Sequence, residues 1–429
     1  MLLITKERQF DMHVSLVGIS HKTAPVAVRE KVAISSADLG DALGALSSFV
    51  PHGVILSTCN RTEVYATGNN CRTATFDFLS SHLGIPIEDL EEYAYCAMER
   101  GVIEHAFRMA SGLDSMVVGE FEILGQAGVA LDAAEKAATT NLALRQLFRN
   151  AIRTGRRVRD ETAISRNAVS VSSVAIDLIT EVFGSLEDSK MIVIGAGEAG
   201  RLVAKVAKER GLPDLRVTSR TRERAAELAN ELHGAAFNLV DLVDEMKTAN
   251  IVVACTNAPH WIMDTEQVSR VLNSRNGNPL LMMDISVPRN IEPAIGKLKN
   301  VFLYNIDDLS RISDANRQGR EAEIKKAGEI VAEETQRFLD WWQTLKYRPV
   351  VTSLMTKAEE IRRTHLEKTV KRLRPLSDEE LENLDSMTKA IVTKILHDPI
   401  QYLKSSDGNN GDYAAVVSEL FRLNREEIE

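Results

Sequence analysis

The stretch MIVIGAGEAG, Met191 to Gly200, decides the fold of the middle of this chain. A short apolar run ends in a glycine-rich loop, and a helical stretch continues to Arg210. GxGxxG between a strand and a helix is typical of dinucleotide-binding folds, in which the glycines permit a tight turn, approach to a pyrophosphate and close packing. The alternative is that they serve packing alone. The candidate cofactor-binding residues are Gly195, Ala196, Gly197, Glu198, Ala199 and Gly200.

Four further apolar runs share the pattern of MIVIG. They are LRVTS from Leu215, IVVAC from Ile251, LLMMDI from Leu280 and VFLYN from Val301. Helical stretches separate them, which indicates a parallel sheet with crossover helices. We therefore predict an α/β Rossmann-like, NADP-binding domain over residues 161–308.

The end of the second predicted strand indicates which dinucleotide binds. NAD sites usually place an acid there for the ribose 2′-hydroxyl. This chain has Ser219 and Arg220 instead. A hydroxyl and a guanidinium can bind a 2′-phosphate that a carboxylate would repel, so the predicted cofactor is NADPH. The alternative is that this arginine begins a solvated helix.

The flanking segments differ from this domain and from each other. Residues 1–160 mix strand-like runs, such as His13–Ile19, with helical ones, which predicts an α+β domain. Residues 309–429 show helical spacing only, with a long helix, a break at 347–349 and a capping box at Ser377–Glu380. The apolar sides of such helices are covered by a partner chain or within a self-contained bundle.

The composition is that of an ordinary globular protein. The 429 residues are 44% hydrophobic and 26% charged. No secretory signal or membrane span is evident, so we expect a cytoplasmic location and no membrane partner. The four cysteines form no CxxC pair and have long, unequal spacing, which argues against both a disulfide framework and a metal site.

One cysteine lies in a polar turn after a predicted strand, in LSTCNRTE, Leu56 to Glu63. A packing thiol is more often flanked by apolar residues, and a metal ion would lack further ligands. Cys59 is therefore a candidate nucleophile, with packing as the alternative, and a cation such as Arg61 would raise its thiolate fraction. Combined with NADPH, a nucleophilic cysteine indicates acyl reduction, because a thioester accepts hydride and leaves as an aldehyde.

Several motifs, in order, resemble those of the glutamyl-tRNA reductase family. They are GISHKTAPVAVREK (Gly18 to Lys31), SxTCNRTE, SGLDSMVVGE with ILGQ (Ser111 to Gln126), GAGEAG and DISVPRNI (Asp284 to Ile291). The resemblance implies NADPH-dependent reduction of glutamyl-tRNA to glutamate-1-semialdehyde, the first step of the five-carbon route to tetrapyrroles. It also implies a catalytic domain over 1–160 and an all-α dimerisation domain on a long helix over 309–429, in a homodimer.

The resemblance also implies roles for single residues. Cys59 attacks the aminoacyl ester and releases tRNA, Arg61 clamps the glutamyl carboxylate, and Glu120 takes the substrate ammonium. The acid at position 122 departs from the glutamine common in the family and adds negative charge near the substrate. Further substrate contacts are expected from Thr58, Asn60, Ser115, Phe121, Glu122 and Gln126.

Two histidines are further candidates. His105 matches a histidine that the family places near the thiol, where it could hold a proton for the thiolate or for the leaving ribose oxygen. We favour an active-site role for it without assigning a step. His21, in a polar loop, is the weaker candidate, and a structural role is preferred.

An arginine stripe is the candidate contact for tRNA. No acid occurs between residues 135 and 160, and four arginines there share one helical face: Arg145, Arg149, Arg153 and Arg156. They would bind tRNA phosphates or form a solvated face.

Two other functions remain open at this point. The first is an NADPH-dependent oxidoreductase of a small free acid, because the middle domain also resembles that of shikimate-dehydrogenase-like proteins. The second is a nucleotide-sensing or RNA-binding protein without turnover. For the reductase, the family implies that the labile product passes to an aminomutase, and a domain swing would bring the thioester to the nicotinamide.

Overall fold

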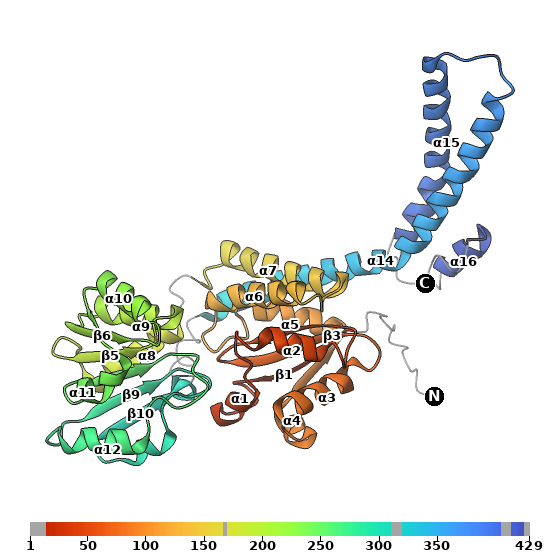
Figure 1. Cartoon of the computed structure of the whole chain (residues 1–429). Coiled ribbons are helices and arrows are strands. Elements are labelled where there is room, and N and C mark those ends of the chain that lie inside the picture. The colour runs from red at the N-terminus through yellow and green to blue at the C-terminus, as the bar shows by residue number, and fades with distance from the viewer. Residues whose placement is uncertain (1–13, 166–169, 310–319, 405–412, 424–429) are drawn as a thin grey trace. The chain divides into compact units, whose positions relative to one another are not determined.

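The computed structural model describes residues 14–165, 170–309, 320–404 and 413–423 (Figure 1). The chain divides into two compact units, residues 1–332 and 333–429. The first unit contains two β-sheets, and the second is helical where it is described.

The N-terminal domain is built on a four-stranded antiparallel sheet in the order β2-β3-β1-β4. Its two central strands are buried along their whole length, so both faces of the sheet are covered. The strands are β1 (Val14–Ser20), β2 (His52–Ser57), β3 (Arg61–Thr67) and β4 (Tyr95–Met98). The helices are α1 (Val26–Val32), α2 (Leu39–Leu46), α3 (Cys71–Leu83), α4 (Ile87–Tyr93), α5 (Arg100–Ala110), α6 (Glu122–Lys136) and α7 (Leu142–Glu161).

The predicted α+β class of this domain is confirmed. Strand β4 was not predicted, because a four-residue edge strand with alternating half-buried and exposed residues gives little signal. It matters for the site described below, since it carries Tyr95, whose hydroxyl reaches Glu63 on the central strand β3.

The middle domain is a six-stranded parallel sheet in the order β10-β9-β8-β5-β6-β7, with a separate apolar core on each face. All five predicted strands are present. The strands are β5 (Lys190–Ile194), β6 (Asp214–Thr218), β7 (Ala235–Ala236), β8 (Ile251–Ala254), β9 (Leu280–Asp284) and β10 (Val301–Asn305). The helices are α8 (Val171–Phe183), α9 (Glu198–Glu209), α10 (Arg222–Glu231), η1 (Leu239–Asp241), α11 (Leu242–Met246), α12 (Thr265–Asn273) and η2 (Pro293–Lys297).

The strand order of this sheet reverses between β5 and β8, on either side of which the chain winds in opposite directions. In open α/β sheets, ligands bind at such a switch point, outside the carboxyl ends of the strands. The loop 195–200 leaves β5 at this place, so the predicted Rossmann-like arrangement is confirmed.

The remaining described residues form the helices α14 (Glu321–Val370), α15 (Asp378–Lys404) and α16 (Tyr413–Leu420). The capping box at the start of α15 is confirmed, because Ser377 N donates to Glu380 (2.9 Å) and Glu380 N donates to Ser377 Oγ (3.3 Å). None of the described helices has an apolar stretch of the length that a bilayer crossing requires.

The predicted break at 347–349 is wrong, because α14 continues through it. A proline inside a helix removes one hydrogen bond of the ladder and clashes with the preceding turn, at a cost of about 3 kcal/mol, so a continued helix needs stabilisation from packing. Beyond the proline, Val350 and Leu354 are buried against Leu396 and Leu403 of α15, and this packing stabilises the second half of α14.

Space around the loop 195–200 requires glycine at two positions. Gly195 has φ +117°, and a Cβ atom there would lie 2.5 Å from the Cys255 carbonyl oxygen. A Cβ on Gly200 would lie 1.9 Å from the Gly195 carbonyl oxygen. A Cβ on Gly197 would meet no atom within 4 Å, so this glycine is not required by packing.

The two alanine substitutions should therefore differ. Gly200→Ala forces the loop away from β5 and should destabilise the middle domain by on the order of 3 kcal/mol, whereas Gly197→Ala should cost at most about 1 kcal/mol. Thermal unfolding of the two variants, monitored by circular dichroism, measures the difference. Equal midpoints would contradict the packing role of Gly200.

Candidate active site

Cys59 lies at the tip of the hairpin that joins β2 to β3. Thr58 N donates to the Arg61 carbonyl (2.8 Å), which closes the hairpin. The Thr58 hydroxyl accepts from the backbone N–H groups of Asn60 and Arg61, both at 3.1 Å. Thr58 thus fixes the turn, and the thiol projects from it partly buried, against a core that includes Val26 and Met116.

A second segment holds this turn from the side. His21 N donates to the Asn60 carbonyl (2.9 Å), and Arg29 Nη1 donates to the Cys59 carbonyl (2.6 Å). Asn60 is buried, and its side-chain oxygen lies 3.4 Å from Arg29 Nη1. The sequence predicted substrate contact for Asn60, and the structure also gives it this role in the turn.

Burial raises the pKa of the Cys59 thiol to about 12, and the carboxylates of Glu120 and Glu122 act in the same direction. Arg29 is the cation that lowers it. The thiol is therefore protonated at neutral pH without substrate, and it needs a change in its surroundings to become a nucleophile.

A buried carboxylate, Glu63, organises the strands behind the turn. It accepts from Arg61 Nη1 (2.6 Å), Tyr65 Oη (2.6 Å), Tyr95 Oη (2.5 Å) and His105 Nε2 (2.9 Å). Burial alone would raise the pKa of Glu63, but the charges and hydrogen bonds of His105 and Arg61 outweigh it and hold the pKa below its ordinary range. Glu63 is ionised in the folded protein.

This network determines where Arg61 and His105 point. Arg61 is almost fully buried and donates both to Glu63 and to the Asp114 carbonyl (2.7 Å), so only its remaining N–H groups can meet a substrate. His105, on α5, is bonded to Glu63 and is partly exposed. The structure therefore places both residues in one network with the strand that follows Cys59.

The loop 111–120 and the start of α6 carry the other predicted substrate contacts. Glu120 is buried, and burial raises its pKa to about 7; Glu122 acts in the same direction, and Arg61 and Arg159 oppose it. The Ser115 hydroxyl is buried close to Glu120, without a hydrogen bond of ordinary geometry to the residues described.

Three predicted contacts lie at the start of α6. Phe121 is exposed, and its ring lies 5.9 Å from the Arg159 guanidinium carbon. Glu122 and Gln126 are half-buried one helical turn apart. Burial raises the pKa of Glu122, and the charge of Glu198, the first residue of α9, adds to the shift. Glu122 in turn raises the pKa of Glu120.

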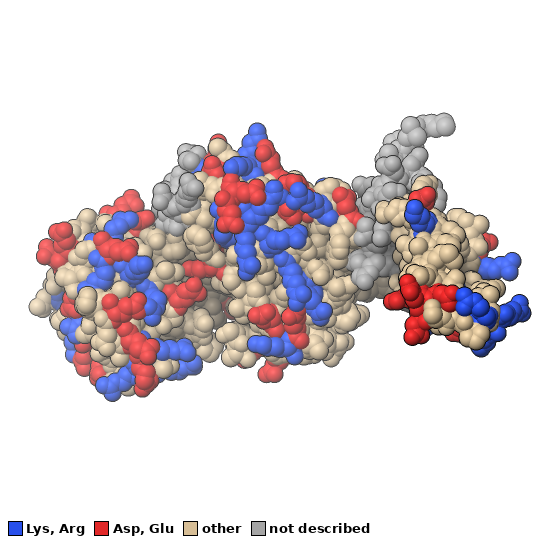
Figure 2. Space-filling view, turned by 90° about the horizontal axis from the view of Figure 1, so that it is seen from above, with Lys and Arg blue, Asp and Glu red and all other residues tan. Residues whose placement is uncertain are grey.

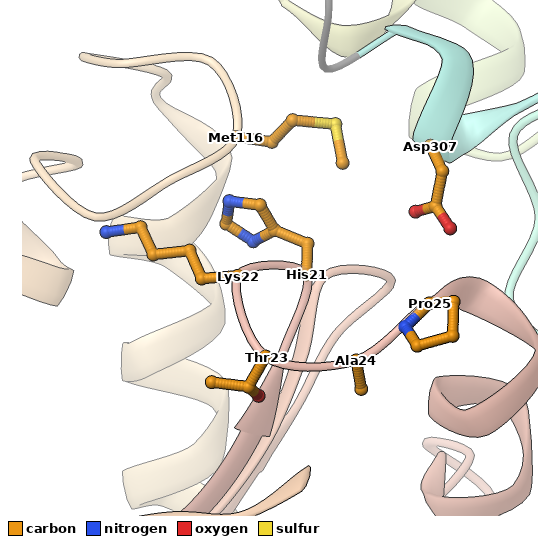
Figure 3. Close-up of a pocket in the computed structure, with 7 residues that line it drawn as sticks. All are labelled: His21, Lys22, Thr23, Ala24, Pro25, Met116 and Asp307. Carbon is orange, nitrogen blue, oxygen red and sulfur yellow. The ribbon is translucent and has the colours of Figure 1, made fainter.

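A cavity of about 390 Å³ lies beside the His21 loop, lined by residues of both domains (Figure 3). The His21 ring projects into it between Lys22 and Met116, and Asp307 lies on the opposite wall. Burial, together with Arg61 and Arg29, lowers the pKa of His21 to about 3, so its ring is neutral at neutral pH.

The predicted cofactor residues lie together at the switch point of the sheet. Loop 195–200 leads into α9, with Gly197 and Glu198 exposed. Ser219 and Arg220 follow the neighbouring strand β6, with Ser219 half-buried and Arg220 exposed. Backbone N–H groups at the start of α9 and an arginine at the end of β6 match the chemistry of a pyrophosphate and a 2′-phosphate.

The arginine stripe lies on α7 and is partly neutralised. Arg145 and Arg149 both pair with Glu135, at 3.0 and 3.1 Å. Viewed from above, basic side chains gather over the N-terminal domain, with acidic ones among them (Figure 2). The stripe is thus a mixed surface with an excess of positive charge along one helix.

Several residues of the site were missed or discounted in the sequence. Arg29 and Glu63 lie within the motifs of the sequence, which did not indicate their contacts with the turn and with His105. For His21 the sequence favoured a structural role, and the hydrogen bond from its backbone N–H to the Asn60 carbonyl is a contact of that kind. Charged residues in or next to strand-like runs, such as Glu63 in RTEVYAT, are the signal that could have identified the buried network.

Comparisons with known proteins match separate parts of the chain and its length as a whole. The family model described as "Glutamyl-tRNAGlu reductase, N-terminal domain" matches residues 17–162, and the model of the reductase dimerisation domain matches residues 326–423. The glutamyl-tRNA reductase of Geotalea daltonii is 39% identical over 421 residues, covering 96% of each chain. That of Geobacter sulfurreducens is 39% identical and covers 97% of each chain.

The chain belongs to the glutamyl-tRNA reductase family. Residues 177–312 also match a model described as "Shikimate / quinate 5-dehydrogenase", which covers the middle domain alone. Among solved structures, the glutamyl-tRNA reductase of Methanopyrus kandleri is 34% identical, covering 96% of this chain and 98% of that one, with a TM-score of 0.48. For this family, then, the shikimate-dehydrogenase likeness describes the nucleotide domain and not the whole protein.

The raised pKa of Glu120 predicts a pH-dependent stability. Between its ordinary pKa near 4.5 and the folded value of about 7, the unfolded chain has lost a proton that the folded protein keeps, so stability falls as pH rises through this window. Glu120→Gln should remove this dependence. The difference in the free energy of unfolding between the variant and wild type should shift in favour of the variant by on the order of 1–3 kcal/mol when the pH is raised from about 5 to about 8.

Urea unfolding at the two pH values measures the effect. The exposed Glu104→Gln serves as a control for the loss of one carboxylate. An equal pH dependence in wild type and Glu120→Gln would show that the buried carboxyl does not titrate in this window.

Proposed function

We propose that this chain reduces glutamyl-tRNA to glutamate-1-semialdehyde with NADPH, through a thioester on Cys59. Membership of the reductase family over the whole chain carries the proposal. The structure supports it with a thiol at the tip of a fixed turn, whose ionisation responds to the charge of the buried Glu120. We further propose the domain boundaries 160/161 and 308/309.

In the proposed reaction the Cys59 thiolate attacks the ester carbonyl carbon of the glutamyl group. The carbon–oxygen bond to the ribose breaks, the ribose oxygen takes up one proton in place of the one that the thiol lost on ionisation, and tRNA leaves. Residues 195–200, with Ser219 and Arg220, would hold NADPH, which would supply the hydride that the thioester carbon accepts. The thiohemiacetal on Cys59 then collapses, which releases the aldehyde and restores the sulfur as a thiolate.

The surroundings of the thiol suit activation by the substrate. Glu120 is one of the carboxylates that keep the Cys59 pKa high. A substrate ammonium bound beside Glu120 would cancel this charge and favour the thiolate. Nucleophile formation would then depend on a correctly seated aminoacyl group, while Arg61 receives the glutamyl carboxylate through N–H groups not used by Glu63.

The roles of Thr58 and His105 follow from the same contacts. Thr58 holds the backbone of the turn, and His105 holds Glu63 as an anion. His105 therefore acts on the reaction through Glu63 and Arg61 in this proposal, and no proton transfer is assigned to it. The remaining substrate contacts are Asn60, Ser115, Phe121, Glu122 and Gln126.

NADPH fits the nucleotide domain for two reasons. At Gly197, directly before α9, a Cβ would meet no protein atom within 4 Å, so the backbone here is open to the close approach of a pyrophosphate. The end of β6 carries a hydroxyl and a guanidinium, Ser219 and Arg220, where a carboxylate would select NAD. The proposed cofactor residues are those predicted from the sequence, Gly195 to Gly200 with Ser219 and Arg220.

The alternative function, reduction of a small free acid, leaves the Cys59 turn unexplained. The matching dehydrogenase model covers only the nucleotide domain. The reductase reaction uses both domains, and its product is an aldehyde beside an amine. We propose that this labile product passes directly to the aminomutase that follows.

For the proposed reaction, a first prediction concerns the nucleophile. Cys59→Ser should lower NADPH oxidation in the presence of glutamyl-tRNA by at least about a thousandfold, because a hydroxyl is not ionised enough to form the acyl intermediate. Cys96→Ser, at an exposed cysteine on β4, is the matched control and should keep the wild-type rate. The absorbance of NADPH measures turnover.

The same assay separates the candidate functions. Wild type should oxidise NADPH with glutamyl-tRNA and not with free glutamate, and without NADPH a glutamyl adduct should accumulate on the Cys59 peptide in mass spectra. An adduct on another residue, or turnover with free glutamate, would refute the proposal.

The second prediction concerns tRNA binding to the stripe on α7. Charge reversal at Arg149 and Arg153 should weaken tRNA binding about tenfold or more and reduce its salt dependence, because each lost phosphate contact removes released counterions. Lys368→Glu with Lys371→Glu makes the same change in charge at exposed positions in or next to α14 and serves as the control. Fluorescence titrations at several salt concentrations give the slope; equal slopes for both variants would refute the assignment.

The third prediction concerns a homodimer through the C-terminal helices, which match the family's dimerisation domain. Met387, Ile391 and Ile395 lie four residues apart on α15 and are 52%, 50% and 66% exposed, an uncovered apolar row. Ile391→Glu with Ile395→Glu should give a monomer in light scattering, whereas the exposed Thr393→Glu should not. A dimer that survives the double substitution would exclude this face.

A further inference from the structure

Two sequence motifs that the reaction does not use meet in the structure. The motif VREK lies on α1, and DISVPRN follows strand β9 of the nucleotide domain. Two neighbouring residues of α1, Arg29 and Glu30, each form an ion pair with a residue of that domain. The partners are Asp307, in the helical residues 306–309 after β10, and Arg289 of the second motif.

The two ion pairs differ in their exposure to water and in the other groups that they contact. Arg289 binds Glu30 through two parallel hydrogen bonds, at 2.9 and 2.6 Å, and both side chains are partly exposed. Asp307 binds Arg29 and also accepts from Val26 N (2.7 Å) at the start of α1. The Arg29 side chain is only 2% exposed, so its charge is balanced inside the protein.

Arg29 extends from this ion pair to the nucleophile turn. The same guanidinium that binds Asp307 donates to the carbonyl oxygens of Cys59 (2.6 Å) and Ala24 (3.3 Å). A planar group with donors in fixed directions can hold several acceptors at once, which an ammonium on a flexible stem cannot do in the same way. One side chain thus joins the nucleotide domain to the thiol-bearing turn.

We propose that Arg29 is a positioning residue that couples the Cys59 turn to the nucleotide domain through Asp307, and that Glu30–Arg289 holds the same boundary without acting on the turn. When Asp307 is in place, it neutralises Arg29 and fixes the turn. When Asp307 moves away, Arg29 keeps its bond to Cys59 and its full charge acts on the thiol.

The charges around the thiol make this coupling measurable. Glu120 and Glu122, from the loop before α6 and its first residue, face the thiol with Arg29 from α1. Of these three, only Arg29 favours the thiolate. Removing the negative charge at position 307 increases the effect of the Arg29 charge on the thiol. The substitution does not change the side chains of Arg29, Glu120 or Glu122 themselves.

The experiment compares Asp307→Asn with Glu30→Gln in the full-length protein. Each substitution removes one carboxylate and one ion pair at the same boundary, but only the first frees Arg29. The rate of iodoacetamide alkylation of the Cys59 peptide, followed by mass spectrometry at fixed pH, reports the thiolate fraction. Asp307→Asn should react about threefold faster than wild type, which corresponds to a Cys59 pKa lower by about half a unit. Glu30→Gln should react at the wild-type rate.

Asp307→Glu restores a carboxylate and should return the rate to the wild-type value. Equal rates in wild type and Asp307→Asn, equal acceleration in Asp307→Asn and Glu30→Gln, or a fast rate in Asp307→Glu would each overturn the coupling. Asp307→Asn leaves the buried Arg29 with its other acceptors, so it avoids the unfolding that removal of Arg29 would risk. Circular dichroism confirms that each variant is folded.

The functional meaning of this coupling rests on the proposed role of Cys59 as nucleophile. The alkylation rate depends on the thiol alone and not on turnover. If alkylation is faster in Asp307→Asn alone and the Cys59→Ser enzyme is still active, the proposed function is refuted and the coupling stands. If the Cys59→Ser enzyme is inactive and alkylation is equally fast in wild type and Asp307→Asn, the coupling alone is refuted.

Discussion

The N-terminal domain depends on the hydrogen bonds and ion pairs around one carboxylate that is buried away from water, that of Glu63. A charge in such a place is stable only if donors surround it. Here they come from three elements, with Arg61 and Tyr65 on β3, Tyr95 on β4 and His105 on α5. The network holds these elements in one arrangement directly behind the hairpin that carries Cys59, and it explains why a glutamate occupies a fully buried strand.

The reactivity of the thiol depends on the charged groups that are not paired within this network. Arg61 is next to the turn in sequence, yet its charge is committed to Glu63 and the Asp114 carbonyl. Arg29, thirty residues earlier, is the cation that favours the thiolate, against burial and two carboxylates. The resting site is thus a protonated thiol in a negative field, which suits a nucleophile that a cationic substrate group activates.

The nucleotide domain could be predicted almost completely from the sequence. Strands buried on both faces are continuous apolar runs. The need for glycine at position 200 is local, because the Gly195 carbonyl oxygen excludes a Cβ there. At Gly195 the excluding atom is the Cys255 carbonyl oxygen, just after β8, which the fold brings beside the loop. The capping box of α15 is local in the same way. The break expected at 347–349 failed because packing of Val350 and Leu354 on α15, which no local pattern contains, favours a continued helix.

The sequence by itself determined most of the elements, the strand–loop–helix unit at residues 191–210 and the position of Cys59 in a polar turn, because each leaves a pattern in residues a few positions apart. Only the tertiary structure decided which charges meet. Glu63 with His105, Arg29 with Cys59, and Arg29 with Asp307 join residues 42, 30 and 278 positions apart. Such pairs follow from strand order and domain packing, and ionisation of a buried group depends on all its neighbours at once. The motifs therefore located the chemistry, and the fold set the charge on its reacting atom.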